Sequence, residues 1–214
     1  MYLPKQFEET RVDVLHTFIR ECGFATVVTV ADGALNANHL PLLLEPTPEP
    51  FGTLHGHVAR ANSMWHDTSP EVDALAVFHG PEIYISPSLY PTKRETGKVV
   101  PTWNYVVVHA YGRIRFYEDP DRLLDHVQQL TNHHEGGRPE PWRVSDAPDD
   151  YVAAQLRGIV GLDMTITRLI GKWKVSQNRA AVDRQAVADG LRAGDENAAA
   201  MAALVKAAAD KPGA

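Results

Sequence analysis

The feature that most constrains the fold is a succession of strand-like segments with no helix between them. Asp32-Gly33 is a strong hairpin signal between two such segments, and Gly80-Pro81 predicts a second turn. Because strands joined by short connections pair antiparallel, this many of them in about 100 residues predicts a barrel or a sandwich. The predicted strands cover residues 24–30, 36–44, 53–58, 75–78 and 83–86.

The rest of the chain predicts two longer strands and several helices. A strand is expected over 102–117, with Gly112 as a bulge or bend, and another over 160–174, interrupted near Gly171. Asp119-Pro120 is a helix start, followed by a loop over 133–141, and residues 210–214 are expected to fray. Helices are predicted over 12–22, 120–132, 180–191 and 196–209, with a short one after Asp149.

Composition narrows the class of protein. The 214 residues are 44% hydrophobic and 22% charged, which is typical of a globular chain with its own core. No apolar stretch is long enough for a membrane span, the first residues do not resemble a signal peptide, and Cys22 is the single cysteine, so we expect a cytoplasmic protein without disulfides. The net charge of −6 disfavours nucleic acid as a partner.

Several chemistries are excluded because their motifs are absent. The chain has no GxxxxGK[ST] loop, no GxGxxG turn after a strand and no GxSxG elbow. Among ten histidines, His55 and His57 share one strand face and His133-His134 lies in a predicted loop, but no metal-ligand spacing is present, so no metal site is predicted. The sequence identifies no catalytic residue.

Three segments combine hydrogen-bond donors with aromatic or basic side chains: 56–62, 84–105 and 171–179. In the first, Arg60 ends a strand with a guanidinium that suits a phosphate, although a surface ion pair is the alternative. In the third, strand alternation predicts that Lys172 and Lys174 share one face and Trp173 the other. Basic groups beside aromatic rings suit nucleic acid, a flavin or a pyridoxal ring, and a buried tryptophan at a subunit interface is the alternative.

At these segments the sequence resembles the PaiB-like proteins, described as FMN-binding negative transcriptional regulators. The resemblance covers nearly the whole chain, and its longest motifs are GHVARAN at 56–62, YISPSLYP at 84–91 and GKWKVSQNR at 171–179. It is also present at residues 1–5, 38–41, 99–105, 141–142, 145–146 and 159–161. It implies a mainly β fold with flanking helices, namely a six-stranded antiparallel Greek-key split barrel, which forms homodimers with FMN in a groove between subunits.

The resemblance also implies domain bounds and cofactor contacts. Residues 1–178 are expected to form the FMN-binding barrel and 179–214 an alanine-rich helical extension packed on it. Arg60 and Lys93 resemble phosphate contacts, and Asn62 and Ser86 resemble donors to the phosphate or ribityl group. The residues expected to line the ring, some from the partner subunit, are Trp103, Asn104, Trp173, Gln177 and Asn178.

Three functions remain open on the sequence. The first is a transcriptional repressor whose dimer binds FMN, with direct DNA binding disfavoured by the negative charge. The second is a small FMN-dependent oxidoreductase, similar to flavin reductases or pyridoxamine phosphate oxidases, and haem binding on the same barrel is related to it. The third is a cofactor-free interaction module. Whether the chain turns over a substrate is left open.

Overall fold

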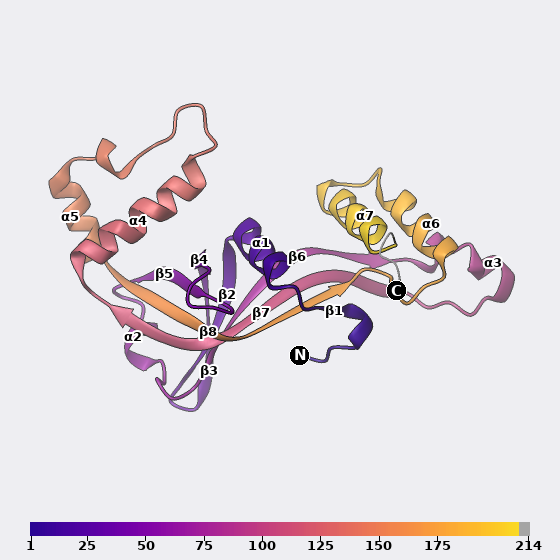
Figure 1. Cartoon of the computed structure of the whole chain (residues 1–214), viewed down its shortest axis with the longest axis horizontal. Helices are drawn as coiled ribbons and strands as arrows, with labels where there is room; N and C mark the ends of the chain where they lie inside the picture. Colours follow the sequence, from indigo (N-terminus) through magenta and orange to yellow (C-terminus); the bar gives the residue numbers. More distant parts are fainter. Residues whose placement is uncertain (210–214) are drawn as a thin grey trace. The chain divides into compact units, whose positions relative to one another are not determined.

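The computed structural model describes residues 1–209, so the predicted fraying of 210–214 lies outside the described residues. Within them a mainly antiparallel sheet is flanked by helices (Figure 1). The strands are β1 Glu8–Glu9, β2 Phe24–Ala31, β3 Ala34–Pro41, β4 Leu43–Glu45, β5 Thr53–Ala59, β6 Ala74–Ile85, β7 Thr102–Tyr117 and β8 Ile159–Lys174. The α-helices are α1 Val12–Cys22, α2 Met64–Asp67, α3 Thr92–Thr96, α4 Pro120–Glu135, α5 Asp149–Arg157, α6 Ala181–Leu191 and α7 Glu196–Ala209. The 3-10 helices are η1 Lys5–Phe7, η2 Pro87–Leu89 and η3 Val144–Asp146.

The sheet confirms the predicted fold class with a different strand count. Its order is β3-β2-β6-β7-β8-β5-β4, and β1 also pairs with β8, so the described residues form eight strands where six were expected. The hairpin predicted at Asp32-Gly33 joins β2 to β3 in an antiparallel register that runs from Phe24 opposite Pro41 to Ala31 opposite Ala34. β5 pairs antiparallel with β8 over its whole length.

The predicted turn at Gly80-Pro81 is wrong, because both residues lie inside the continuous strand β6. A Cβ at residue 80 would lie 2.7 Å from the ring of Phe18, so the glycine permits close packing against α1 and does not mark a reversal. Proline has no backbone N–H to donate to a neighbouring strand. β6 pairs with β2 only at residues 75–77, so Pro81 removes no hydrogen bond from that pairing.

Three other predicted boundaries also differ. The strand expected over 36–44 is split into β3 and β4 at Leu42, whose N–H bonds the carbonyl of Gly23 at 2.8 Å. β8 is continuous through Gly171, where a Cβ would lie 2.3 Å from Leu15, so packing again explains the glycine. α4 continues to Glu135 and thus includes the histidines of the predicted loop.

The chain divides into two compact units. Unit 1 comprises Met1–Phe18, His79–Val108 and Ile170–Ala209 of the described chain, and unit 2 comprises Ile19–Phe78 and His109–Leu169. The boundary expected at residue 178 remains a prediction, since the units interleave along the sequence and the long strands β6, β7 and β8 contribute to both.

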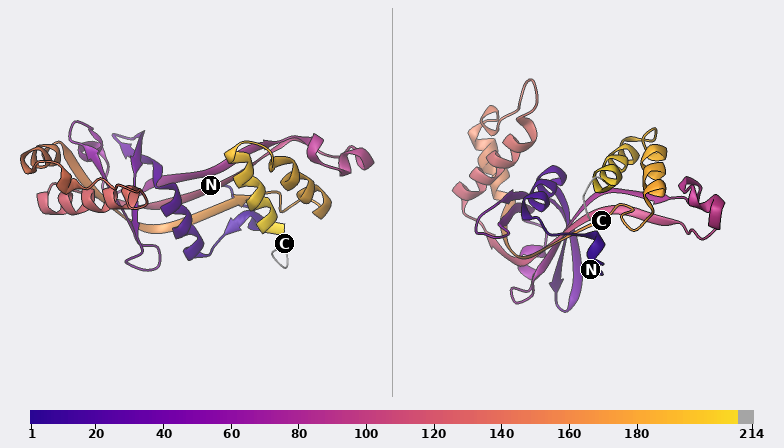
Figure 2. Two further views of the ribbon diagram at one scale, coloured as in Figure 1. Left: turned by 90° about the horizontal axis from the view of Figure 1, so that it is seen from above. Right: turned by 45° about the vertical axis from the view of Figure 1, so that its right-hand side comes forward.

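The core of unit 1 lies beneath the two C-terminal helices, which run side by side (Figures 1 and 2). The core includes Ile85 of β6, Val106 of β7 and Val175, which directly follows β8. From α6 and α7 it receives Val187, Met201 and several alanines, among them Ala202. The alanine-rich composition of the helices therefore permits their close approach to each other and to the strands.

The core of unit 2 is built by strand alternation. β2 buries Ala25 and Val27, and β5 buries Leu54 and Val58, with their neighbours more exposed. Gly112 lies on β7 where a Cβ would meet the carbonyl oxygen of Thr165 at 2.1 Å, so a close backbone approach requires the glycine. Within residues 1–209 no helix has the length and apolar character to cross a membrane.

Candidate functional site

The residues predicted to bind the cofactor fall in both units. Arg60 and Asn62 belong to unit 2, and the other seven belong to unit 1. Each set is described within its own unit, starting from the exposed strand face that carries Trp103 in unit 1.

Strand alternation divides the unit 1 sheet into a helix-covered face and an open face. Because Ile85, Val106 and Val175 point to the helices, their neighbours Tyr84, Tyr105 and Lys174 point the other way. Trp103 shares the open face and is 53% exposed, and Tyr84 is 48% exposed. Their rings meet edge to face, with centroids 6.1 Å apart at 69°. We call Tyr84, Trp103, Tyr105, Lys172 and Lys174 the open aromatic face.

The cations of the open aromatic face have no acidic partner among residues 1–209. The Nζ of Lys174 donates to Thr102 Oγ1 and to the Trp103 carbonyl, both at 2.5 Å, and the buried Lys172 donates to the Tyr2 carbonyl at 2.9 Å. Burial, with the nearby charges of Lys172 and Arg179, lowers the pKa of Lys174. An anion placed here would relieve this repulsion and satisfy the remaining donors.

Three residues predicted to contact the flavin ring do not lie on the open aromatic face. Asn104 and Trp173 point to the helix-covered side of the strands, and Gln177 lies in the turn after β8. Asn104 is 1% exposed and donates to Ser176 Oγ at 2.9 Å, and Trp173 packs edge to face on Phe18 with centroids 5.3 Å apart. Gln177 accepts from the N–H of Val175 at 2.8 Å and donates to the carbonyl of Trp173 at 2.5 Å, which closes the turn after β8. The structure thus gives these residues packing and turn contacts within the chain.

The remaining predicted residues of unit 1 lie in the connection after β6 and beyond β8. Ser86 is the N-cap of η2, and its hydroxyl oxygen accepts from Ser88 N at 3.2 Å and from Ser88 Oγ at 2.8 Å. Lys93 is exposed on α3, and Asn178 is exposed beyond β8. The start of α3 is held by Asp183, which accepts from the Thr92 hydroxyl at 2.7 Å. Contact of Ser86, Lys93 or Asn178 with a cofactor remains a prediction.

In unit 2, Arg60 and Asn62 are already engaged by the protein. Arg60 donates to the Arg157 carbonyl at 2.7 Å and to the Ile159 carbonyl at 3.3 Å, and it forms an ion pair with Glu118. Asn62 donates to Asn38 Oδ1 at 2.8 Å and accepts from the N–H of Met64 at 2.9 Å at the start of α2. A phosphate at Arg60 would have to share its guanidinium with Glu118, so this contact also remains a prediction.

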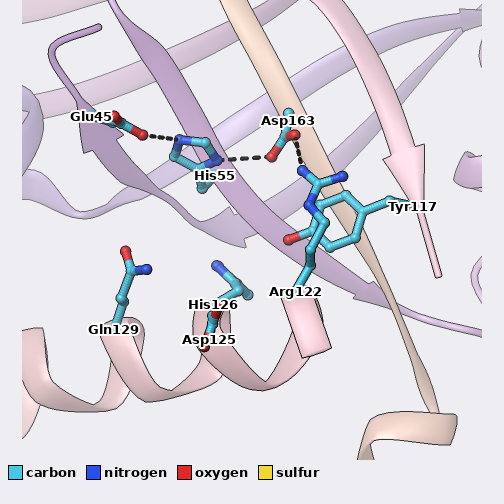
Figure 3. A pocket seen from close by; sticks show the side chains of 8 residues that line it. All are labelled: Glu45, His55, Tyr117, Arg122, Asp125, His126, Gln129 and Asp163. Carbon is cyan, nitrogen blue, oxygen red and sulfur yellow. Dashed lines mark hydrogen bonds and ion pairs between the residues drawn. The ribbon is translucent and has the colours of Figure 1, made fainter. Parts of the chain in front are cut away.

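A polar pocket of unit 2 was not predicted from the sequence. His55 contacts Glu45 at 3.3 Å and Asp163 at 2.8 Å, and Arg122 bonds the second oxygen of Asp163 at 2.6 Å (Figure 3). The Arg122 guanidinium also stacks 3.9 Å from the centre of the Tyr117 ring. The pocket measures about 190 Å³. His55 and Asp163 meet because they are paired across β5 and β8, although 108 positions separate them in the chain.

A pair of histidines lies beside this pocket. His57 Nδ1 and His126 Nε2 are 3.0 Å apart, and His126 is 5% exposed. Burial, assisted by the neighbouring His57 and His55, lowers the pKa of His126 to about 4, and burial also lowers the pKa of His57. Both imidazoles are therefore neutral at pH 7. No group of three or more His, Cys, Asp or Glu side chains within residues 1–209 is arranged to hold a metal ion.

Comparison with known proteins gives both a family and a fold. Residues 1–168 match the model of the family described as "Putative FMN-binding domain". The chain is 34% identical over 207 residues to the protease synthase and sporulation protein PAI 2 of Bacillus subtilis, covering 96% of this chain and 97% of that one. An uncharacterized protein of Aspergillus fumigatus is 34% identical over 256 residues, covering 98% of each chain.

Two solved structures share the fold at low sequence identity. The flavocytochrome Anf3 from Azotobacter vinelandii has a TM-score of 0.56 at 10% identity, covering 78% of this chain and 69% of that one. The FAD and heme binding protein from Mycobacterium smegmatis has a TM-score of 0.55 at 14% identity, covering 78% of this chain and 73% of that one.

Proposed function

The chain belongs to the PaiB-like family of FMN-binding split-barrel proteins, with FMN as its cofactor, and from this premise we propose that it acts as an FMN-binding homodimer with a regulatory role. The observation that carries the proposal is the open aromatic face, where exposed rings lie beside cations that have no acidic partner among residues 1–209. FMN combines a planar ring with a phosphate, and both parts match this set of side chains.

In this proposal the residues of the open aromatic face divide the contacts to FMN. The rings of Trp103 and Tyr84 offer apolar surface to the isoalloxazine, and Lys174, supported by Lys172 and Arg179, places positive charge for the phosphate. Bound FMN supplies reversible acceptance of electrons or hydride. Asn104, Trp173 and Gln177 act indirectly, because their contacts hold β7 and β8 in place.

The proposed dimer follows from the exposure of this same surface. Two large aromatic side chains, about half exposed on neighbouring strands, leave apolar area in water that association would remove. A second copy of the chain can cover the rings and exclude water from the flavin. We therefore expect FMN binding and dimer formation to be coupled.

The regulatory role is proposed from the similarity to PAI 2, whose name refers to protease synthesis and sporulation. The net charge of −6 argues for an indirect effect on transcription and against direct DNA binding. The role fits a cytoplasmic protein with one cysteine. Deletion of the gene in its own organism should raise the transcripts it represses, and the wild-type gene should lower them again. Unchanged transcripts would contradict the regulatory role.

Titration of the flavin-free full-length protein with FMN tests the site. Quenching of FMN fluorescence gives the affinity, and light scattering of the same samples gives the mass. Trp103→Ala should weaken binding about tenfold, the effect of losing an aromatic stacking partner.

Phe24→Ala is the matched control, because Phe24 is an equally exposed aromatic residue on β2 and lies outside the open aromatic face. This variant should bind FMN as the wild type does. Equal losses in both variants, or none in Trp103→Ala, would remove the open aromatic face from the site. A monomeric FMN-bound protein would contradict the proposed dimer.

A further inference from the structure

Unit 2 contains a second cavity, which is distinct from the polar pocket and mostly apolar. It measures about 260 Å³ and lies between α4, η3, α5 and the strands β5 and β8. Its aliphatic lining includes Val127 of α4, Val152 and Leu156 of α5, and Ile159 of β8. A cavity of about 150 Å³ is large enough for benzene, so this one has room for a bicyclic or substituted ring.

Two aromatic residues at this cavity are exposed to solvent. Trp142 is 49% exposed and Tyr151 is 57% exposed, and both line the cavity. Leaving this much aromatic surface in water is unfavourable, and a flat apolar molecule lying against it would remove the surface from solvent. The shape and the lining therefore favour an aromatic ligand over an ion or a sugar.

His57 is the polar group that orients such a ligand. Its Nδ1 is engaged with His126 Nε2, and its side chain lines the apolar cavity, which leaves Nε2 to face an occupant. A single convergent polar group in an apolar cavity is the usual arrangement by which proteins select one small molecule over its apolar analogues.

The polar pocket on the other side of the pair determines which hydrogen-bonding role His57 takes. His126 borders this pocket, where Glu45, Asp125 and Asp163 outnumber the single cation Arg122 (Figure 3). Of the two tautomer arrangements that the 3.0 Å contact allows, their negative potential favours the one in which His57 Nδ1–H donates to His126 Nε2. A neutral His57 then carries its lone pair on Nε2. His57 is consequently an acceptor toward the apolar cavity.

We propose that this cavity is a binding site for a small aromatic molecule that donates one O–H or N–H hydrogen bond to His57 Nε2. The site is separate from the open aromatic face, and the proposal does not depend on FMN binding. In this proposal His126 acts as a positioning residue, because it fixes the orientation and tautomer of His57 without touching the ligand.

Indole and 1-methylindole are suitable probes, because they have almost the same shape and only indole donates an N–H hydrogen bond. Ligand-observed NMR with the FMN-loaded full-length protein should show saturable indole binding, with 1-methylindole about tenfold weaker. His57→Leu should bind the two probes equally. His126→Leu should also reduce the preference for indole, which a merely space-filling role of His126 would not do.

A filled cavity provides the negative control. Ala147→Phe places a ring in the cavity and should abolish binding, whereas Ala154→Phe, an exposed position on α5 outside the cavity, should leave it intact. Circular dichroism verifies that the variants fold. The proposal is overturned if indole shows no saturable binding up to ~5 mM, if the wild type binds both probes equally, or if Ala147→Phe binds like Ala154→Phe.

Discussion

Cations lie beside aromatic rings in both units, and two of those in unit 2, Arg60 and Arg122, are paired with carboxylates of the protein. On the open aromatic face of unit 1, Lys174 bonds a hydroxyl and a carbonyl and has no carboxylate within reach among residues 1–209. In unit 2, Arg122 is stacked on Tyr117 and bonded to Asp163, and Arg60 is paired with Glu118. Lys174 can therefore pair with an external anion, whereas Arg122 and Arg60 already stabilise the fold.

The polar network of unit 2 and the open aromatic face of unit 1 also differ in how far other elements surround them. The polar network of unit 2 is assembled across β4, β5, β8 and α4, so its groups are held from several sides. The open aromatic face has strands behind it and solvent in front. We therefore expect changes in unit 2 to alter mainly stability, and changes on the open aromatic face to alter mainly FMN affinity.

The largest expected effect on stability is a pH dependence that arises in unit 2. Burial holds the pKa of His126 near 4, against about 6.5 in an unfolded chain. Between these values the unfolded chain binds a proton that the folded chain does not, so the free energy of unfolding falls as pH falls from 6.5 to 4. His126 alone accounts for about 3 kcal/mol of this decrease, and His57 adds to it.

Urea denaturation at a series of pH values measures this dependence. His126→Gln should flatten the curve between pH 6.5 and pH 4, and His133→Gln, an exposed position on the same helix, should reproduce the wild-type curve. An unchanged curve in His126→Gln would show that the buried pair does not control acid stability.

Gly161→Ala tests how tightly the side chains of unit 2 pack, without changing any charge. Gly161 is paired with His57 across β8 and β5, and a Cβ there would lie 2.2 Å from the ring of Tyr117. The ring would have to move and would no longer support Arg122, so we expect a loss of about 2 kcal/mol in the free energy of unfolding. Gly137→Ala, where the added Cβ has open space, should be close to neutral. Equal urea midpoints for both variants would mean that the strand tolerates the methyl group.

Lys174→Met tests the open aromatic face directly. Removal of a charge-assisted contact to phosphate should weaken FMN binding about thirtyfold, and added salt should reduce the difference from wild type. Lys206→Met removes an equally charged side chain from the exposed surface of α7 and should leave FMN binding unchanged. Fluorescence titration at two salt concentrations measures both variants. A wild-type affinity in Lys174→Met would show that the phosphate lies elsewhere.

Much of the fold could be predicted from local patterns. The strand-like residues of 24–30 and 53–58 correctly predicted β2 and β5, and Asp119-Pro120 correctly marked the start of α4. Gly80 and Gly171 were misinterpreted because their reason is long-range, namely the close approach of Phe18 and Leu15 on α1. A glycine required by packing is identical in sequence to one required by a turn.

The candidate site was predicted less well than the fold. Strand parity correctly placed Lys172 and Lys174 opposite Trp173, and the same parity could have separated Asn104 from Trp103. His57 and His126 are 69 positions apart, so no sequence motif predicts that they meet. Such clusters follow from strand register and helix packing, which become known only once the chain is folded.

The smallest expected effect is that of Arg60→Ala on FMN affinity, and it is the sharpest test of the comparison. The Arg60 guanidinium is already bonded to two main-chain carbonyls and to Glu118, so its loss should change FMN affinity by less than about twofold. Glu118→Gln is the informative partner variant, because it frees the guanidinium. A thirtyfold loss in Arg60→Ala, joined by tighter binding in Glu118→Gln, would mean that the phosphate displaces Glu118 and that a paired cation can also serve the cofactor. Unchanged affinity in both variants would assign Arg60 to the stability of unit 2 and leave the phosphate to the lysines of the open aromatic face.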